Sequence, residues 1–83
     1  MTHRVHVRVI PRTGLLDPQG QVVEHALGSL GFGGVRDVRI GKAIELTVEA
    51  DSTDAAEAQV RQMCERLLAN PVTEDFLIDV ESR

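Results

Sequence analysis

The stretch Arg4-Val5-His6-Val7-Arg8-Val9 alternates charged or polar side chains with valines. A period of two is typical of a strand with one buried and one exposed face. Pro11 follows at once and is expected to end the strand, because proline cannot donate a ladder hydrogen bond. The valines therefore predict the core side of a sheet, and the polar residues predict its other face.

After this strand the sequence predicts a helix over residues 18–30. Asp17 suits the N-cap, and Pro18 suits the first helical position, where a missing N–H costs nothing. Gly20 weakens the first turn by up to ~1 kcal/mol relative to Ala, which makes sense if another backbone, chain or ligand comes close. Otherwise it is an incidental glycine in a good cap. Gly31-Phe32 predicts a left-handed C-terminal cap with the Phe side chain folded back. The expected apolar stripe is Val22, Val23, Ala26, Leu27 and Leu30.

Two strands joined by a tight turn are expected next, over residues 35–40 and 43–49. Gly41-Lys42 lies between them, and glycine first in a two-residue loop suits a type II′ hairpin turn. In the second strand the alternating apolar residues face one side of the sheet. They are Ile44, Leu46 and Val48.

A second helix and a last strand complete the pattern. Residues 51–54 offer several helix caps, with a capping box expected from Asp54 to Glu57. Asn70-Pro71 ends the helix, and the strand over 73–80 follows. The helix stripe is Ala56, Val60, Met63, Cys64, Leu67 and Leu68, and the strand turns Phe76, Ile78 and Val80 inward.

The order strand-helix-strand-strand-helix-strand predicts one α+β domain over residues 1–83 with the ferredoxin-like βαββαβ fold. Its four-stranded antiparallel sheet would carry both helices on one face. If the first strand and the strand over 43–49 are central, as in that fold, the open face would set Arg4, His6 and Arg8 between Glu45, Thr47 and Glu49 on one side and Asp75, Leu77 and Asp79 on the other. Such a face is either a neutralised surface that packs on another sheet or a solvated charge ladder.

Composition narrows the function classes. The chain of 83 residues has a net charge of −4, which argues against a nucleic-acid binder, and no basic run suggests an anionic membrane. We expect no signal peptide and no membrane span. A single cysteine cannot form an internal disulfide, which suits the cytoplasm. A chain this small often gains stability from its own copies or a partner.

No catalytic or metal-binding constellation is expected. His3 and His6 would point to opposite faces of a strand, and a third ligand would have to come from His25 or Cys64 on helices. Cys64 fits the core better than a nucleophile's role. The serines at 29, 52 and 82 lack a nucleophile elbow. An RNA-recognition module would need strand aromatics that are missing here. An ACT-like domain that senses small molecules remains the alternative function.

Three segments together resemble a known family across nearly the whole chain. They are Leu16-Asp17-Pro18-Gln19-Gly20, then Val38-Arg39-Ile40-Gly41-Lys42 with Ile44-Glu45-Leu46, and Cys64-Glu65-Arg66-Leu67-Leu68-Ala69-Asn70-Pro71-Val72 with Glu74-Asp75-Phe76. In this order they resemble PurS, the small subunit of phosphoribosylformylglycinamidine (FGAM) synthase.

The resemblance implies a non-catalytic subunit of a glutamine-dependent ligase of purine biosynthesis. It implies a large synthetase subunit (PurL) that binds ATP, Mg²⁺ and formylglycinamide ribonucleotide, and a glutaminase subunit (PurQ) that releases ammonia. The small subunit would bridge the two, hold no cofactor itself, and form a homodimer or a dimer of dimers.

Eight residues of these segments are the candidates for subunit contacts. Exposed recognition is expected of Asp17, Gln19, Arg39, Lys42, Asn70 and Glu74, and close approach is expected at Gly20 and Gly41. Each has an alternative role as a helix cap, part of a turn or a solvated charge.

Overall fold

The computed structural model of the chain describes residues 1–12 and 17–81. Along the chain these form β1 (Thr2–Pro11), α1 (Pro18–Ser29), β2 (Lys42–Glu49), α2 (Thr53–Met63), a π-helical turn η1 (Cys64–Leu68) and β3 (Glu74–Val80). The sequence predictions that involve Leu16 and Ser82 lie outside the described residues.

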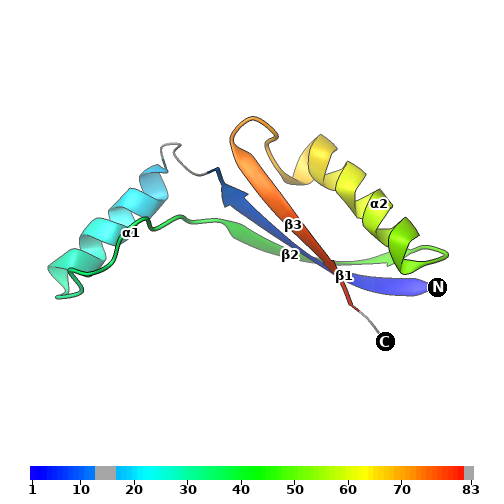
Figure 1. Cartoon of the computed structure of the whole chain (residues 1–83), viewed down its shortest axis with the longest axis horizontal. Helices are drawn as coiled ribbons and strands as arrows, with labels where there is room; N and C mark the ends of the chain where they lie inside the picture. Colours follow the sequence, from blue (N-terminus) through cyan, green and yellow to red (C-terminus); the bar gives the residue numbers. More distant parts are fainter. Residues whose placement is uncertain (13–16, 82–83) are drawn as a thin grey trace.

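The sheet has the order β2-β1-β3, and both pairings are antiparallel (Figure 1). Val7 of β1 pairs with Ile44 on β2 and with Ile78 on β3. The expected central position of the first strand is therefore confirmed, whereas that of the strand over 43–49 was wrong, because β2 lies at the edge of the sheet. Its three valines, Val5, Val7 and Val9, are fully buried, as the alternation predicts.

One helical layer, α2 with η1, covers the core face of the sheet (Figure 1). Ser52 is its N-cap and accepts a hydrogen bond from the Ala55 N–H at 3.0 Å, so the helix starts before the predicted Asp54 cap, which was wrong. Ala56, Val60 and Cys64 are fully buried at intervals of four residues.

The π-helical turn corrects the predicted end of this stripe. The Ala69 N–H bonds to the Cys64 carbonyl at 3.0 Å, five residues back. This wider turn returns the chain to the core one residue later, so Ala69 is buried and Leu67 is 83% exposed. Met63 is also exposed, and both predicted core positions were wrong.

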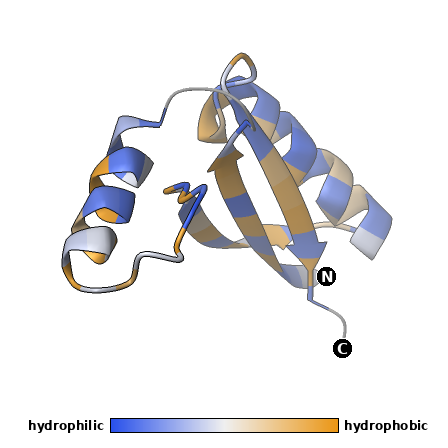
Figure 2. Cartoon of the chain, turned by 60° about the vertical axis from the view of Figure 1, so that its left-hand side comes forward, coloured by the Kyte–Doolittle hydropathy of each residue, from blue (hydrophilic) through white to orange (hydrophobic). Residues whose placement is uncertain are grey.

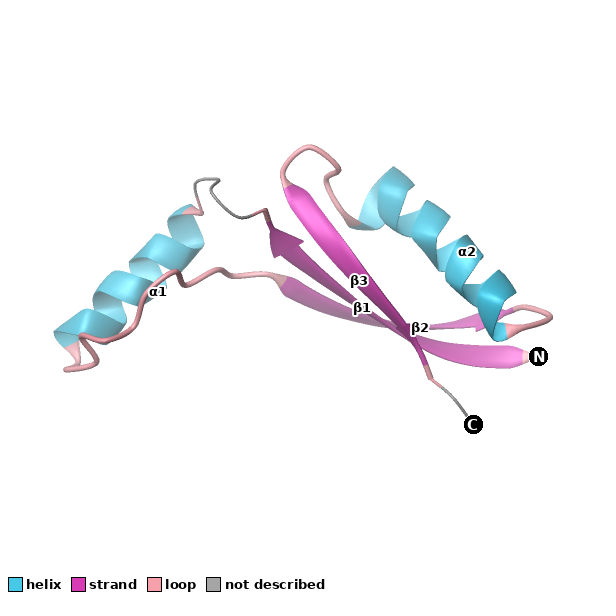
Figure 3. Cartoon of the chain, in the orientation of Figure 1, coloured by secondary structure: helices cyan, strands magenta, loops and turns pink. Residues whose placement is uncertain are grey.

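The predicted fourth strand was wrong as well. Residues 35–40 belong to no strand, and the chain runs straight into β2 at Lys42 without the predicted hairpin turn (Figure 3). Two backbone N–H groups of this segment, which a strand would use for pairing, instead donate to carboxylates on α1 and at its N-cap position. Glu24 accepts from Val38 at 3.2 Å, and Asp17 accepts from Ile40 at 2.8 Å. The described residues therefore form a three-stranded α+β fold and not the four-stranded ferredoxin-like sheet.

α1 does not join α2 on the sheet, which corrects the prediction of two helices on one face. It lies beyond the end of the sheet, beside the segment 35–41 (Figure 1). The radius of gyration is 16.1 Å, against about 12 Å for a compact chain of this length. Its predicted stripe is therefore uncovered, since Val22 and Leu30 are 69% and 73% exposed. Figure 2 shows α1 standing apart from the sheet.

The end of α1 follows the sequence prediction in its backbone. Gly31 has a left-handed φ of 101°, and the Phe32 N–H bonds to the Leu27 carbonyl at 2.9 Å. The Phe32 side chain stays 58% exposed, however, because nothing in the described chain packs over this helix end.

Candidate interaction site

Five of the eight predicted contact residues gather at one end of the sheet. β1 ends there while β2 and β3 begin, since Val9 pairs with Lys42 and Pro11 pairs with Glu74. The antiparallel register thus brings two segments that are distant in sequence to either side of the β1 end. The residues concerned are Arg39, Gly41, Lys42, Asn70 and Glu74.

Arginine side chains hold these segments to the end of β1. The Arg39 Nη1 donates to the Pro11 carbonyl at 3.2 Å. Arg12 donates through Nη2 to the Pro71 carbonyl at 2.6 Å, and its Nε lies 3.4 Å from a carboxylate oxygen of Asp75. The strand ends and the loops beside them are therefore linked through side chains.

Asn70 and Glu74 shape the loop that enters β3. The Glu74 carboxylate accepts from the Asn70 N–H at 2.7 Å, and the Asn70 side-chain oxygen accepts from the Val72 N–H at 3.0 Å. Asn70 thus has the local capping role predicted as its alternative, whereas Glu74, whose alternative was a solvated charge, accepts a backbone hydrogen bond. Both side chains remain at the surface, at least in part.

Asp17 and Gly20 clasp α1 to the segment 35–41. A Cβ on Gly20 would lie 2.1 Å from the Val38 carbonyl oxygen, so the close backbone approach predicted for this glycine is confirmed. The Asp17 carboxylate accepts from the Ile40 N–H, and that bond, followed by the Gly20 N–H, lowers the pKa of Asp17. Asp17 stands at the predicted N-cap position of α1.

Gln19 lies apart from the sheet end, on an apolar groove of about 470 Å³ between α1 and the segment 35–41. The lining residues are Pro18, Gln19, Val22, Val23 and Ile40.

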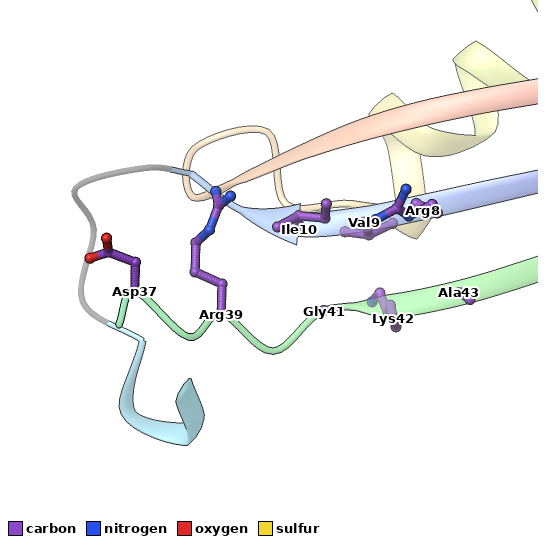
Figure 4. Close-up of a pocket in the computed structure, with 8 residues that line it drawn as sticks. All are labelled: Arg8, Val9, Ile10, Asp37, Arg39, Gly41, Lys42 and Ala43. Carbon is purple, nitrogen blue, oxygen red and sulfur yellow. The ribbon is translucent and has the colours of Figure 1, made fainter. Parts of the chain in front are cut away.

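A second groove, of about 430 Å³, opens at the junction of β1 and β2 (Figure 4). At its edge Gly41 lets the backbone pass close to β1, because a Cβ there would lie 2.2 Å from the Val9 carbonyl oxygen. Arg39 reaches from the segment 35–41 toward the end of β1 (Figure 4). The lining residues are Arg8, Val9, Ile10, Asp37, Arg39, Gly41, Lys42 and Ala43.

Comparison with known proteins identifies the family. The family model of PurS, described as phosphoribosylformylglycinamidine (FGAM) synthase, matches residues 4–82. The PurS subunit of that synthase from Bacillus subtilis is 48% identical over 79 residues, which cover 95% of this chain and 93% of the relative. The PurS subunit from Mycobacterium leprae is 45% identical, with 96% and 98% covered.

The chain belongs to the PurS family.

Solved PurS structures share the open arrangement. The B. subtilis PurS structure superposes with a TM-score of 0.84 at 48% identity, covering 99% of this chain and all of that one. A chain of the PurLQS structure from Thermotoga maritima gives 0.87 at 32% identity, with 98% and 99% covered. Agreement over whole chains includes α1, so its place beyond the sheet is a property of the PurS fold.

Arg8 of this PurS chain differs from the other cations of the open face, and the sequence did not predict this difference. It was predicted in a row of compensated charges on the open face. Arg4 and His6 do have such partners: Arg4 lies 2.9 Å from Glu45, and His6 lies 2.8 Å from Glu81. Arg8 instead pairs across the strands with Ala43 and Leu77, which bring no charge. The signal in the sequence was the apolar residue at each of these open-face positions.

The remaining predicted groups of the PurS chain lie apart. His3 is buried on the core face while His6 lies on the open face, as the strand alternation predicts. Within residues 1–12 and 17–81, no three His, Cys, Asp or Glu side chains are placed to hold a metal ion. Cys64 is buried in the core, as predicted, and its burial raises the pKa of the thiol. None of the described helices is long and apolar enough to cross a membrane.

Proposed function

We propose that this chain is the non-catalytic small subunit of phosphoribosylformylglycinamidine synthase. It bridges a PurL-like synthetase subunit and a PurQ-like glutaminase subunit. In this role it couples glutamine hydrolysis and ammonia transfer to the ATP-dependent amidation of formylglycinamide ribonucleotide. ATP and Mg²⁺ bind to the large subunit, and the small subunit carries no cofactor.

The observation that carries this proposal is the match over the whole chain to PurS, including a chain of a PurLQS structure. The structure supports the same role in another way. Asp17, Gly20, Arg39 and Gly41 hold loops in place through backbone contacts, which suits a rigid surface for docking.

An adaptor of this kind solves a chemical problem. Ammonia that escapes into water near neutral pH is largely protonated, and the ammonium ion has no lone pair for attack on the activated substrate. Fixing the two active sites in register lets ammonia pass between them without release, and docking also excludes water. A small rigid protein can contribute to catalysis in this way without touching a reacting atom.

We also propose that the subunit works as a homodimer or a dimer of dimers, through the uncovered apolar face of α1. This face consists of Val22 and Val23 on α1 and Leu30 at its C-cap, with Ile40 beside them across the apolar groove. Apolar surface of this extent on a small elongated chain favours burial against a second copy. Light scattering at micromolar concentration tests this, and a clean monomer contradicts it.

A pair of matched substitutions locates that interface. Val22 and Leu67 are both apolar, exposed and helical, but only Val22 lies on the α1 face. Val22→Glu is expected to reduce the mass to that of one chain, because it would bury a charge in the interface, whereas Leu67→Glu leaves the mass unchanged.

Reconstitution tests the function. The large and glutaminase subunits from the same organism are assayed with ATP, Mg²⁺ and substrate, using either glutamine or ammonium chloride as the nitrogen source. Addition of this chain is expected to raise glutamine-dependent turnover and to leave ammonia-dependent turnover nearly unchanged. Equal glutamine-dependent turnover with and without the chain refutes the proposal.

The subunit is placed in the cytoplasm, with the enzyme it serves. In support, Cys64 is a free thiol in the core, which suits a reducing compartment. Fractionation of native extract tests the location, since recovery outside the cytosolic fraction contradicts it.

A further inference from the structure

We propose that the groove at the junction of β1 and β2 docks an acidic segment of a different subunit, with Arg8, Arg39 and Lys42 as the recognising cations. The inference rests on the proposed function, and it assigns to one surface of the adaptor a partner of defined chemistry. The groove holds about 430 Å³ and opens along the end of the sheet (Figure 4).

Charge is distributed unevenly at this place. Three of the lining side chains are cationic and only Asp37 is acidic, although the whole chain carries a net charge of −4. Among the residues that the structure describes, neither Arg8 nor Lys42 forms an ion pair. Arg39 is oriented toward the groove by its bond to the Pro11 carbonyl. The local excess of positive charge favours an acidic partner.

On the open face of the sheet, the cations away from the groove have acidic partners. Arg4 and His6 each lie within 4 Å of both Glu45 and Glu81. Beside the groove, the residues directly opposite Arg8 on the two neighbouring strands, Ala43 and Leu77, are apolar, and Leu77 is 60% exposed. A partner that brings a carboxylate and an apolar side chain would pair the cation and cover this leucine at once.

A second copy of this chain does not fit the groove laid against itself, because Arg8 and Lys42 would then face their own equivalents. Like charges opposed across an interface cost several kcal/mol. The α1 face, whose groove is lined mainly by apolar side chains, is better suited to self-association. The two surfaces thus differ in the partner that each can take.

A small phosphorylated ligand fits less well than a protein surface. Sites for small molecules bury most of the ligand within a concave pocket. Here Arg8, Arg39 and Lys42 are all exposed, and the groove is open along its length. Exposed cations spread over an open groove suit a broad contact with acidic side chains.

The experiment reverses single charges and measures binding to the large subunit and to the glutaminase subunit separately. Arg8→Glu and Lys42→Glu alter the groove. Arg66→Glu is the matched control, because Arg66 is exposed on η1, in the layer that covers the opposite face of the sheet. We expect Arg8→Glu and Lys42→Glu to weaken binding to one subunit at least tenfold. Arg66→Glu should stay within twofold of wild type. Wild-type binding to that subunit should also weaken as salt is raised.

The outcomes separate this inference from the proposed function. If wild type raises glutamine-dependent turnover while both groove variants bind both subunits as tightly as wild type, the groove inference is overturned and the proposed function stands. If wild type has no effect on turnover, both fail. Displacement of the partner by inorganic phosphate, beyond the effect of chloride at equal ionic strength, would assign the groove to a phosphate ligand and also overturn the inference. Should Arg8→Glu fail to fold by circular dichroism, Arg8→Gln with Lys42→Ala gives the same comparison.

Discussion

Substitution of Gly20 by alanine tests the clasp between α1 and the segment 35–41. The new Cβ would lie 2.1 Å from the Val38 carbonyl oxygen, and the Asp17 carboxylate is only 2.6 Å away. Real Cβ contacts essentially never fall below 3.0 Å, so the carbonyl must retreat by about 1 Å. Such a shift would lengthen the 2.8 Å bond between Ile40 and Asp17 beyond hydrogen-bonding range.

The magnitude follows from two opposed effects. Overpacking of this kind costs about 1–3 kcal/mol, and replacing glycine by alanine in a helix returns up to about 1 kcal/mol. The net expectation is a loss of about 1–2 kcal/mol, and each kcal/mol lowers the melting temperature of a domain this size by roughly 4–8 °C.

Gly28→Ala is the matched control, since a Cβ there meets nothing within 4 Å in the same helix. It is expected to be stabilising by about 0.5–1 kcal/mol. Both variants are unfolded in urea at one protein concentration and followed by far-UV circular dichroism. The reasoning is refuted if Gly20→Ala is as stable as Gly28→Ala.

Four further substitutions, in three tests, probe the same framework. Asp17→Asn should reduce the loss of stability at acid pH. Because the pKa of the Asp17 carboxylate is lowered in the folded state, its stabilising contribution is full above the unfolded pKa near 3.8 and is lost as the pH falls through the folded pKa. The urea midpoints of the variant at pH 7 and pH 3 should therefore lie closer together than those of the wild type. Gly41→Ala should destabilise by about 1–3 kcal/mol, because its Cβ would meet a β1 carbonyl at 2.2 Å; an unchanged urea midpoint contradicts the close approach. Val60→Ala should cost about 2 kcal/mol in the core, whereas Leu67→Ala stays within about 0.5 kcal/mol, and the reverse order would argue against the π-helical turn.

Local patterns predicted the elements that pack on the sheet. The alternation through Val5, Val7 and Val9 placed the central strand and its buried face correctly, because burial of one face alone dictates a period of two. The close approach at Gly20 was also predictable, since glycine is costly in a first helical turn where no contact requires it.

The fourth strand was mispredicted because residues 35–40 have a strand-like sequence, but their backbone N–H groups bond to side chains and not to a neighbouring strand. Residues 35–40 include three β-branched residues, Val35, Val38 and Ile40, which suits a strand, although Asp37 between them has a left-handed φ of 56°. Whether the segment joins the sheet depends on which acceptors bond to the Val38 and Ile40 N–H groups. Those acceptors are the carboxylates of Glu24 and Asp17. Sequence periodicity reports on buried faces and carries no information about such side-chain acceptors.

The cations of the charged groove were found only in part for a similar reason. Arg39 and Lys42 were chosen because they lie in Val38-Arg39-Ile40-Gly41-Lys42, a segment that carries the resemblance to PurS. The role of Arg8 depends on what lies across from it, and that is fixed by the register with Ala43 and Leu77. Charge compensation is a property of three aligned strands, so it becomes visible only after the strands are paired.

The missing fourth strand also explains how one small chain can offer two unlike surfaces. Side chains of an extended segment point alternately to opposite sides. Along 37–40, Asp37 and Arg39 line the charged groove at the sheet end, while Ile40 lines the apolar groove on α1 and the Val38 carbonyl packs on Gly20. As an edge strand beside β2, this segment would turn one of these sides toward α2 and remove it from contact with partners. In the proposed assembly the segment can serve both a second copy and an acidic subunit, because Glu24 and Asp17, and not the sheet, accept from its Val38 and Ile40 N–H groups.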